Sequence, residues 1–524
     1  MTFDLIIKNG TVIDGAAVEP YLSDIGISGS EIKAIGNLSG AKAAKIIPAD
    51  GMYVTPGFVD VQNHSDSYLT IMELPTQDSM ITQGITTIAM GHCGTSLAPL
   101  ASPEALKSIQ KWHSLAGINL NWLTFAEYLT ALENHPLGVN ALSLAGHATL
   151  RRGLIRDEIR VATKEEIKII EKLLSDSLDA GAAGLSLGLV YAHEVNSSAD
   201  ELESVTRLVA QKNKLLSVHL RSEGSHVIES LDEALQLAQK NNCALKISHF
   251  KIRGTKNYPF LEQALGAMDR AYQKGLNISF DVYPYTTSWT VLYTYLPKWA
   301  YEGGRAGILK NIKDPSSRAK IISYLKTQEM SLGSIFIATS ETNPGLVGKT
   351  LSQVAANQEV TVEEALLNVL EATNAQVVVF DRNLSEEILE TLLKHPLSLV
   401  GTDGAGYDFG FTPTRGLVHP RCFGTMPRFL SMVRDKKLMS WSDAIKKITV
   451  KPAEKLRLYR RGKIAVDYFA DLVVFNPATI GSKATYENPY QQSDGISHVV
   501  VNGREVFSDR GEMSAEGAGS VLRV

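Results

Sequence analysis

Five side chains able to bind a metal or transfer a proton stand out along the chain of 524 residues: His64, Cys93, His219, His249 and Asp403. Each ends a short apolar run of the kind that forms a buried strand. A polar side chain in such a place costs free energy unless it has a partner. Imidazole, thiolate and carboxylate are the ligands that zinc prefers, and three protein ligands with one open position are typical of a hydrolytic zinc site. The five residues therefore predict one metal site, provided that their strands end together.

The elements that must position these side chains repeat along the chain. Eight candidate strands alternate with longer, amphipathic segments such as 164–178, 232–240 and 258–274; the strands are 58–64, 86–93, 141–147, 184–191, 215–219, 244–249, 278–283 and 397–403. This alternation is typical of parallel βαβ units. Eight units predict an α/β fold of the (β/α)₈ TIM-barrel type, whose active site lies at the carboxyl ends of the strands. All five side chains would then face one mouth.

Both ends of the chain differ from this pattern. The first 57 residues alternate short β-branched runs with Asn-Gly and Asp-Gly turns, and similar runs return in Ala470-Asp-Leu-Val-Val-Phe and His498-Val-Val-Val. Such runs are typical of antiparallel hairpins. We predict that residues 1–57 and 455–524 pair into one small β-sandwich beside a catalytic barrel at 58–454. The alternative is two separate flaps.

The interval between Tyr283 and Asp403 is too long for one βα unit of roughly 30 residues. It is rich in aromatic residues. We predict an insertion at about 287–395 that lies on the active-site face and covers the substrate. The alternative is a helical decoration or an oligomer contact without a part in binding.

Composition excludes several classes of protein. With 52 Lys and Arg against 56 Asp and Glu, the formal net charge is −4, and no basic stripe indicates a nucleic-acid partner. No apolar run approaches the ~18 residues of a membrane span, and the start of the sequence lacks the features of a signal peptide. Three cysteines cannot form a disulfide framework and indicate free thiols or metal ligands in a reducing compartment. We expect a cytoplasmic enzyme.

The order of finer motifs resembles a known family. Thr55-Pro-Gly-Phe-Val-Asp and the strand-end residues are similar to the amidohydrolase superfamily. Further motifs resemble its N-acyl-D-amino-acid deacylase (D-aminoacylase) branch: Gly91-His-Cys-Gly-Thr-Ser, Gly146-His, Gly184-Leu-Ser-Leu-Gly-Leu-Val-Tyr, His219-Leu-Arg-Ser-Glu, Ser248-His-Phe-Lys, Asp281-Val-Tyr-Pro-Tyr, Gly401-Thr-Asp-Gly and His419-Pro-Arg-Cys-Phe-Gly-Thr. The resemblance runs from about Phe3 to Gly503, nearly the whole chain.

The resemblance implies a role for each matching residue. It implies that Cys93, His219 and His249 hold zinc and that Asp403 is the catalytic acid and base. It further implies that the substrate carboxylate is held by three residues, Lys251, Tyr283 and Arg421. The implied reaction is hydrolysis of an N-acyl-D-amino acid to a carboxylate and a free D-amino acid. Ser186 and Tyr191 are expected to line the mouth and contact this small-molecule substrate.

One departure from the family pattern affects the metal count. The first strand of the superfamily normally ends in His-x-His, whereas this chain has Gln62-Asn-His64. Because a neutral amide is a weak zinc ligand, we predict one tightly bound zinc and a second site that is weak or absent. His64 would contact either the metal or the substrate. Asp66 is expected to support the site or to be solvated, and the alternative is that it replaces some of the lost metal ligation.

The residues leave two other functions open. A cyclic-amide hydrolase of the hydantoinase or dihydroorotase type would use a carbamylated lysine at the end of the fourth strand, and residues 184–191 contain no lysine. A non-catalytic scaffold with the same fold would lose metal ligands, and Gln62 is the one feature that favours this alternative. His92 and His147 are expected to support the site, Cys243 to lie in the core, and Cys422 has no assigned role.

Overall fold

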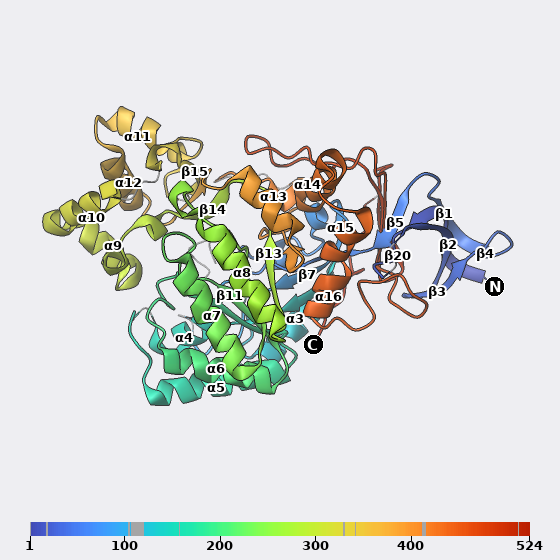
Figure 1. Cartoon of the computed structure of the whole chain (residues 1–524), viewed down its shortest axis with the longest axis horizontal. Helices are drawn as coiled ribbons and strands as arrows, with labels where there is room; N and C mark the ends of the chain where they lie inside the picture. The colour runs from blue at the N-terminus through green and yellow to red at the C-terminus, as the bar shows by residue number, and fades with distance from the viewer. Residues whose placement is uncertain are drawn as a thin grey trace.

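A parallel barrel forms the centre of the molecule (Figure 1). The computed structural model describes residues 2–16, 19–102, 105, 120–156, 158–327, 331–340, 342–410, 416–511 and 513–524. The barrel strands are β6 (Phe58–Asp60), β7 (Ile85–Met90), β8 (Asn140–Ser143) with β9 (Ala145–Gly146), β10 (Gly184–Gly188), β11 (Leu215–His219), β12 (Ala244–Ile247), β13 (Ile278–Val282) and β17 (Ser398–Val400).

Hydrogen bonding joins these strands into a ring. One sheet has the order β6-β7-β8 and another the order β17-β13-β12-β11-β10-β9. The chain runs directly from β8 into β9, and a parallel bridge between Asn63 and Gly404 joins the two outer edges. Each of the eight strands expected from the sequence has a counterpart in this ring, so the predicted (β/α)₈ fold is confirmed.

Amphipathic helices cover the barrel, and local sequence signals set where they begin. At α5, the Thr163 side chain accepts a hydrogen bond from the Glu166 amide while the Glu166 carboxylate accepts one from the Thr163 amide. This reciprocal cap satisfies amides that have no partner within the helix.

None of the helices that the structure describes is long and apolar enough to cross a membrane. The helices outside the insertion are α1 (Thr70–Glu73), α2 (Asp78–Ile81), α3 (Phe125–Glu133), α4 (His147–Ile155), α5 (Lys164–Asp179), α6 (Ala199–Gln211), α7 (Val227–Asn241), α8 (Phe260–Gln273), α13 (Glu386–Lys394), α14 (Arg421–Lys436), α15 (Trp441–Ile448) and α16 (Val450–Lys455).

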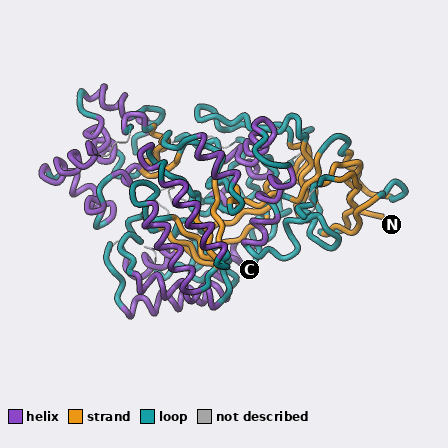
Figure 2. Tube along the Cα trace, in the orientation of Figure 1, coloured by secondary structure: helices purple, strands orange, loops and turns teal. Residues whose placement is uncertain are grey.

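The two ends of the chain meet in one sheet, at the end of the molecule where the N-terminus lies (Figures 1 and 2). Strand β5 pairs antiparallel with β18, and the order is β20-β19-β18-β5-β1-β2-β3, with β4 paired to β1. A shared apolar cluster includes Leu5, Ile27 and Val54 from one end and Leu472 and Val500 from the other. The ends are therefore not separate flaps. The strands are β1 (Thr2–Val12), β2 (Tyr21–Ser28), β3 (Glu31–Gly36), β4 (Lys42–Pro48), β5 (Tyr53–Pro56), β18 (Leu472–Phe475), β19 (Ile496–Val501) and β20 (Arg504–Ser508).

The insertion lies at the opposite end of the long axis, where Figure 1 shows α9 to α12 beyond the barrel. It contains a small antiparallel sheet of order β14-β16-β15. Helix α13 then precedes β17 as the last helix before the eighth strand, so we propose that the insertion ends near Asp381 rather than at 395. We propose the other boundaries as predicted: 1–57 with 455–524, and 58–454. The insertion elements are β14 (Ser288–Val291), α9 (Gly304–Lys313), α10 (Pro315–Thr327), β15 (Phe336–Ser340), α11 (Leu351–Gln358), α12 (Val362–Ala372) and β16 (Val377–Asp381).

Candidate metal centre and active site

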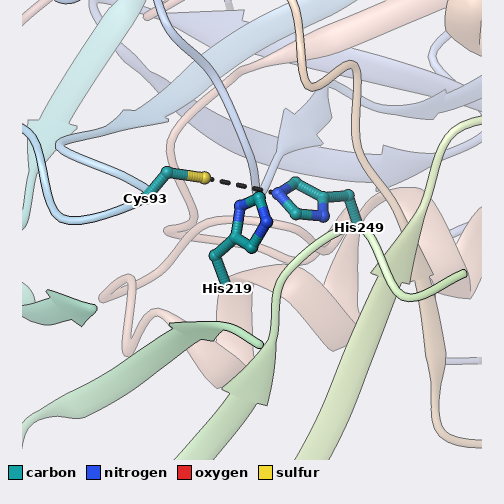
Figure 3. Close-up of side chains that lie close together, drawn as sticks. All are labelled: Cys93, His219 and His249. Carbon is teal, nitrogen blue, oxygen red and sulfur yellow. Dashed lines mark hydrogen bonds between the residues drawn. The ribbon is translucent and has the colours of Figure 1, made fainter. Parts of the chain in front are cut away.

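Three side chains from three strands of the barrel converge at the carboxyl ends of the strands (Figure 3). Cys93 follows β7, His219 ends β11 and His249 follows β12. One donor atom from each lies within 4.8 Å of the others, and Cys93 Sγ is 3.3 Å from His249 Nε2. Among the described residues, the buried Nδ1 atom of His219 has no hydrogen-bond partner. A sulfur and imidazole set with an unsatisfied nitrogen matches the ligand chemistry of zinc.

A second cluster adjoins the first. His64, Cys93 and Asp403 also place one donor atom each within 4.8 Å of one another. His64 Nε2 lies 3.0 Å from Asp403 Oδ1 and 3.9 Å from Cys93 Sγ. The other carboxylate oxygen of Asp403 lies 2.8 Å from Nη1 of Arg421. All five strand-end residues expected from the sequence thus line one cavity, together with Arg421.

Three of these residues have an unusual backbone conformation. The φ angles of Cys93, His249 and Asp403 are 56°, 36° and 49°, in the left-handed region that non-glycine residues rarely adopt. Each residue directly follows a barrel strand or lies within three residues of its end. Such conformations cost of order 1–3 kcal/mol and persist only where surrounding contacts impose them. Three such residues line the same cavity.

The contacts that impose the conformation of Asp403 come from the first strand. The Asp60 carboxylate accepts hydrogen bonds from the amide and hydroxyl of Thr402, at 2.8 and 2.6 Å. The Asp403 amide donates to the carbonyl of Gln62 at 2.8 Å. Because Asp60 is fully buried, this arrangement fixes the Asp403 backbone against the barrel interior.

The loop that carries Cys93 is held by two buried acceptors. The Gly91 amide donates to Asp66 Oδ2 at 2.9 Å, and the Gly94 amide donates to Ser186 Oγ at 3.1 Å. Ser186 is fully buried and β10 turns its side chain toward this loop; its contact with substrate stays a prediction. Asp66 also supports the loop and is not solvated. Tyr191 does line the cavity, as expected.

The electrostatics of the cavity favour two anions. Burial disfavours the ionised carboxyl of Asp403, but the charges of Arg421 and His249 outweigh it and hold its pKa well below the usual range. Burial also opposes the thiolate of Cys93, yet the neighbouring His249, His219 and His64 hold its pKa well below the usual range. An ionised carboxylate and a thiolate that face one cavity match the requirements of a bound cation.

Glu223 is a site residue that the sequence analysis quoted within a motif but gave no role. Its Oε1 lies 2.6 Å from the Lys251 ammonium, 3.2 Å from His249 Nδ1 and 3.7 Å from His219 Nε2. Glu223 is therefore close enough to orient the His249 imidazole, as carboxylates commonly orient metal-binding histidines, whereas its distance to His219 is longer than a hydrogen bond. The signal in the sequence is its position four residues after His219. Lys251 reaches the cavity but is already paired with this carboxylate.

Arg421 is held among aromatic rings at the start of α14. Its guanidinium lies 4.7 Å from the centroid of Tyr283 and 5.4 Å from that of Trp289. Trp289, in β14, stacks on Tyr68 with ring centroids 5.0 Å apart. Arg421 is 3% exposed, and its Nε atom has no hydrogen-bond partner among the described residues. A buried cation with a free donor is suited to a carboxylate ligand.

His419 links Arg421 and the aromatic rings around it to the insertion. Its Nε2 lies 3.1 Å from the Thr287 carbonyl oxygen and its Nδ1 accepts from the Arg421 amide at 3.0 Å. These two partners define a neutral ring with the proton on Nε2. Burial, together with the charge of Arg421, keeps the pKa of His419 well below its usual range. The histidine of the His-Pro-Arg motif thus ties the start of the insertion to the arginine.

The other histidines and cysteines singled out in the sequence lie at different distances from the site. His147 begins α4 and lies 2.9 Å from Glu194 and 3.0 Å from Glu201, all three buried. His92 lines the cavity, and its Nδ1 lies 3.3 Å from Ser217 Oγ. All three cysteines are buried and free. Cys243 lies in the core as expected, and Cys422 Sγ accepts a hydrogen bond from the Ala405 amide at 3.4 Å.

Comparison with known proteins identifies the family. Residues 45–315 and 352–507 match the Amidohydrolase family. The chain is 31% identical to D-aminoacylase of Alcaligenes xylosoxydans xylosoxydans over 99% of its own length and 97% of that protein. Since the match extends over most of the chain, it belongs to the amidohydrolase family.

Two solved structures place the chain within that family. A D-aminoacylase studied for its binuclear metal centre superposes with a TM-score of 0.85 at 30% identity over the whole of both chains. The same values hold for N-acyl-D-glutamate deacylase from Bordetella bronchiseptica, complexed with zinc and a phosphonate that mimics the tetrahedral intermediate. The chain belongs to the D-aminoacylase branch, the N-acyl-D-amino-acid deacylases.

Proposed function

We propose that the protein is a zinc-dependent hydrolase that cleaves the amide bond of N-acyl-D-amino acids to give a carboxylate and a free D-amino acid. One observation carries the proposal: the Cys93, His219 and His249 cluster faces Asp403 and Arg421 across a single cavity. The relatives support it, since D-aminoacylase and N-acyl-D-glutamate deacylase share the fold over the full chain.

Cys93, His219 and His249 would hold the metal, with His64 beside them. When bound there, zinc supplies a Lewis acid that activates water and polarises the scissile carbonyl. Glu223, 3.2 Å from His249 Nδ1, would hold this imidazole with its Nε2 atom toward Cys93.

Asp403 would be the general base and acid. Its low pKa keeps it ionised at neutral pH, so that it can take the proton of the attacking water. It would then return this proton to the departing nitrogen, because an unprotonated amide nitrogen is a poor leaving group. His64, 3.0 Å from Asp403 Oδ1, holds the carboxylate in position.

Arg421 would bind the carboxylate of the substrate, with Tyr283 and Lys251 beside it. The guanidinium offers a planar pair of donors that matches a carboxylate. Lys251 adds a charge that Glu223 partly neutralises. Tyr191, which lies against His219 with ring centroids 5.1 Å apart, would border the acyl side.

The metal count would be one tightly bound zinc per chain. Gln62 replaces the histidine of the usual first-strand pair, which leaves the second position without that ligand. This bears on regulation, because the related D-aminoacylase is described as having one-metal activation and second-metal attenuation. A cytoplasmic location stays a prediction from the cysteine content.

The decisive experiment measures amine release from matched panels of N-acetyl-D- and N-acetyl-L-amino acids, with a hydantoin as a cyclic-amide control. We expect turnover of the D series alone, and loss of that turnover in Asp403→Ala. Metal-loaded wild-type protein that hydrolyses neither series, or that prefers the L series or the hydantoin, would overturn the proposal.

A further inference from the structure

A buried ammonium stands next to Gln62. Lys246 belongs to β12, and its side chain is 0% exposed. Its Nζ atom donates to Gln62 Oε1 at 2.6 Å and forms an ion pair with Asp281 in the barrel interior. Asp281 in turn accepts a hydrogen bond from the His249 amide at 2.9 Å. A lysine in the middle of a barrel requires such partners, because an unpaired buried charge is very costly.

The ammonium decides which way the Gln62 amide points. An ammonium has three donors and no acceptor, so the amide atom beside it must be the carbonyl oxygen. The amide nitrogen consequently points toward Cys93, and Nε2 lies 3.5 Å from Cys93 Sγ. An NH₂ group offers a cation no lone pair. Gln62 thus presents a donor, not a ligand, to the space next to the thiolate.

We propose that Lys246 and Gln62 together take the place of a second metal ion, so that this chain binds a single metal even in excess zinc. The lysine holds the Gln62 carbonyl oxygen on the side away from the thiolate, so that the amide offers a second cation no lone pair beside Cys93. The amide supplies a hydrogen bond to the thiolate in place of a shared metal. This inference rests on the proposed metal site but goes beyond the loss of one ligand: it makes Lys246 a positioning residue.

The test counts bound metal in the full-length protein. Wild type, Q62H, K246Q and Q62H/K246Q are dialysed to equilibrium against excess zinc, and bound zinc is measured by elemental analysis. We expect one equivalent in wild type and in both single variants, and two in the double variant. In Q62H the introduced imidazole still faces the ammonium, and in K246Q the site still lacks a second imidazole.

Several outcomes would overturn the inference. Two equivalents in wild type would show that a second metal is accepted, and two in Q62H would show that Lys246 is no barrier. One equivalent in the double variant, with a circular dichroism spectrum and thermal midpoint close to those of wild type, would show that the pair does not control the site.

A second measurement covers the case in which loss of the buried charge prevents folding of the double variant. Cobalt-substituted wild type is expected to show a thiolate-to-cobalt absorption band that reports on Cys93. We expect K246Q to shift this band, because the Gln62 amide is free to rotate away from the sulfur. The matched control is K455Q: Lys455 is also buried but pairs with Asn277 at 2.8 Å. An unshifted band in folded K246Q, or an equal shift in K455Q, would contradict the role of Lys246.

These readouts separate the inference from the proposed reaction. If no N-acyl-D-amino acid is hydrolysed while the zinc counts follow the expected pattern, the proposed substrate is wrong and the role of Lys246 stands. If turnover is D-selective but wild type binds two zinc ions, the proposed reaction stands and the role of Lys246 is wrong.

Discussion

The two sides of the cavity are built in different ways. The metal side consists of Cys93, His219 and His249, which come from the ends of β7, β11 and β12. The substrate side consists of Tyr283, Trp289 and Arg421, which come from the loop after β13, from the insertion and from α14. Barrel hydrogen bonding fixes most of the metal side directly, since Val218 and Ile247 pair across β11 and β12. The substrate side is assembled by side-chain contacts among segments distant in sequence.

This difference separates chemistry from selectivity. A barrel with metal ligands at its strand ends can be shared by relatives with different substrates, whereas loops and insertions around it vary freely. Asp403 touches both sides, through His64 and through Arg421. We therefore expect changes on the metal side to remove metal and turnover together, and changes on the substrate side to alter affinity or selectivity with the metal retained.

The largest expected effect is that of Cys93→Ala. Loss of the thiolate removes the anionic ligand, and we expect zinc to be lost on dialysis and turnover to become undetectable. Elemental analysis and amine release measure the two effects. Cys243→Ala is the matched control, since Cys243 is buried away from the cavity in the core. Full zinc content in Cys93→Ala would contradict the assignment of Cys93 to the metal side of the cavity.

Asp403→Asn comes next. The amide keeps the shape of the carboxylate but cannot accept the proton of water, and general acid–base catalysis is worth about 10²- to 10⁴-fold. We expect kcat to fall within that range while one zinc remains bound. A fall of less than tenfold would mean that another group transfers the proton.

Arg421→Lys is expected to act on binding. A lysine keeps the charge but loses the planar pair of donors and the contacts with Tyr283 and Trp289. We expect KM to rise roughly 10- to 100-fold, which corresponds to about 1.4–2.7 kcal/mol, with the metal content unchanged. Steady-state kinetics on the best N-acetyl-D-amino acid measure this change. An unaltered KM would place the substrate carboxylate elsewhere.

Trp289→Leu should have the smallest effect and sharpen the comparison most. The ring stacks on Tyr68 at the cavity and contributes no metal ligand. Apolar pocket changes of this size are worth about 1–3 kcal/mol in discrimination. We expect the ratio of kcat/KM between large and small D side chains to change by about tenfold or more, with zinc content as in wild type. Equal changes for all substrates would show a general structural role.

Sequence patterns predicted the metal side well because its residues end buried strands. An apolar run followed by a histidine, cysteine or aspartate can be read directly from the sequence. Parallel strands then bring the residues at their carboxyl ends to one edge of the sheet. Glu223 was visible only as part of a motif, since its role depends on where the loop after β11 turns. The direction of the Ser186 side chain was not readable from the sequence, because a strand residue near the mouth can face either the cavity or a neighbouring loop.

The sequence by itself determined the barrel, the pairing of the chain ends and the residues at the strand ends, because each depends on local periodicity and on the rule that strand ends share one face. Only the tertiary structure decided three further features. It turned Ser186 toward the Gly94 amide, paired Lys251 with Glu223, and placed the Lys246 ammonium against Gln62. These contacts join residues 28 to 184 positions apart along the chain, and no local pattern encodes which buried partner a polar side chain will find.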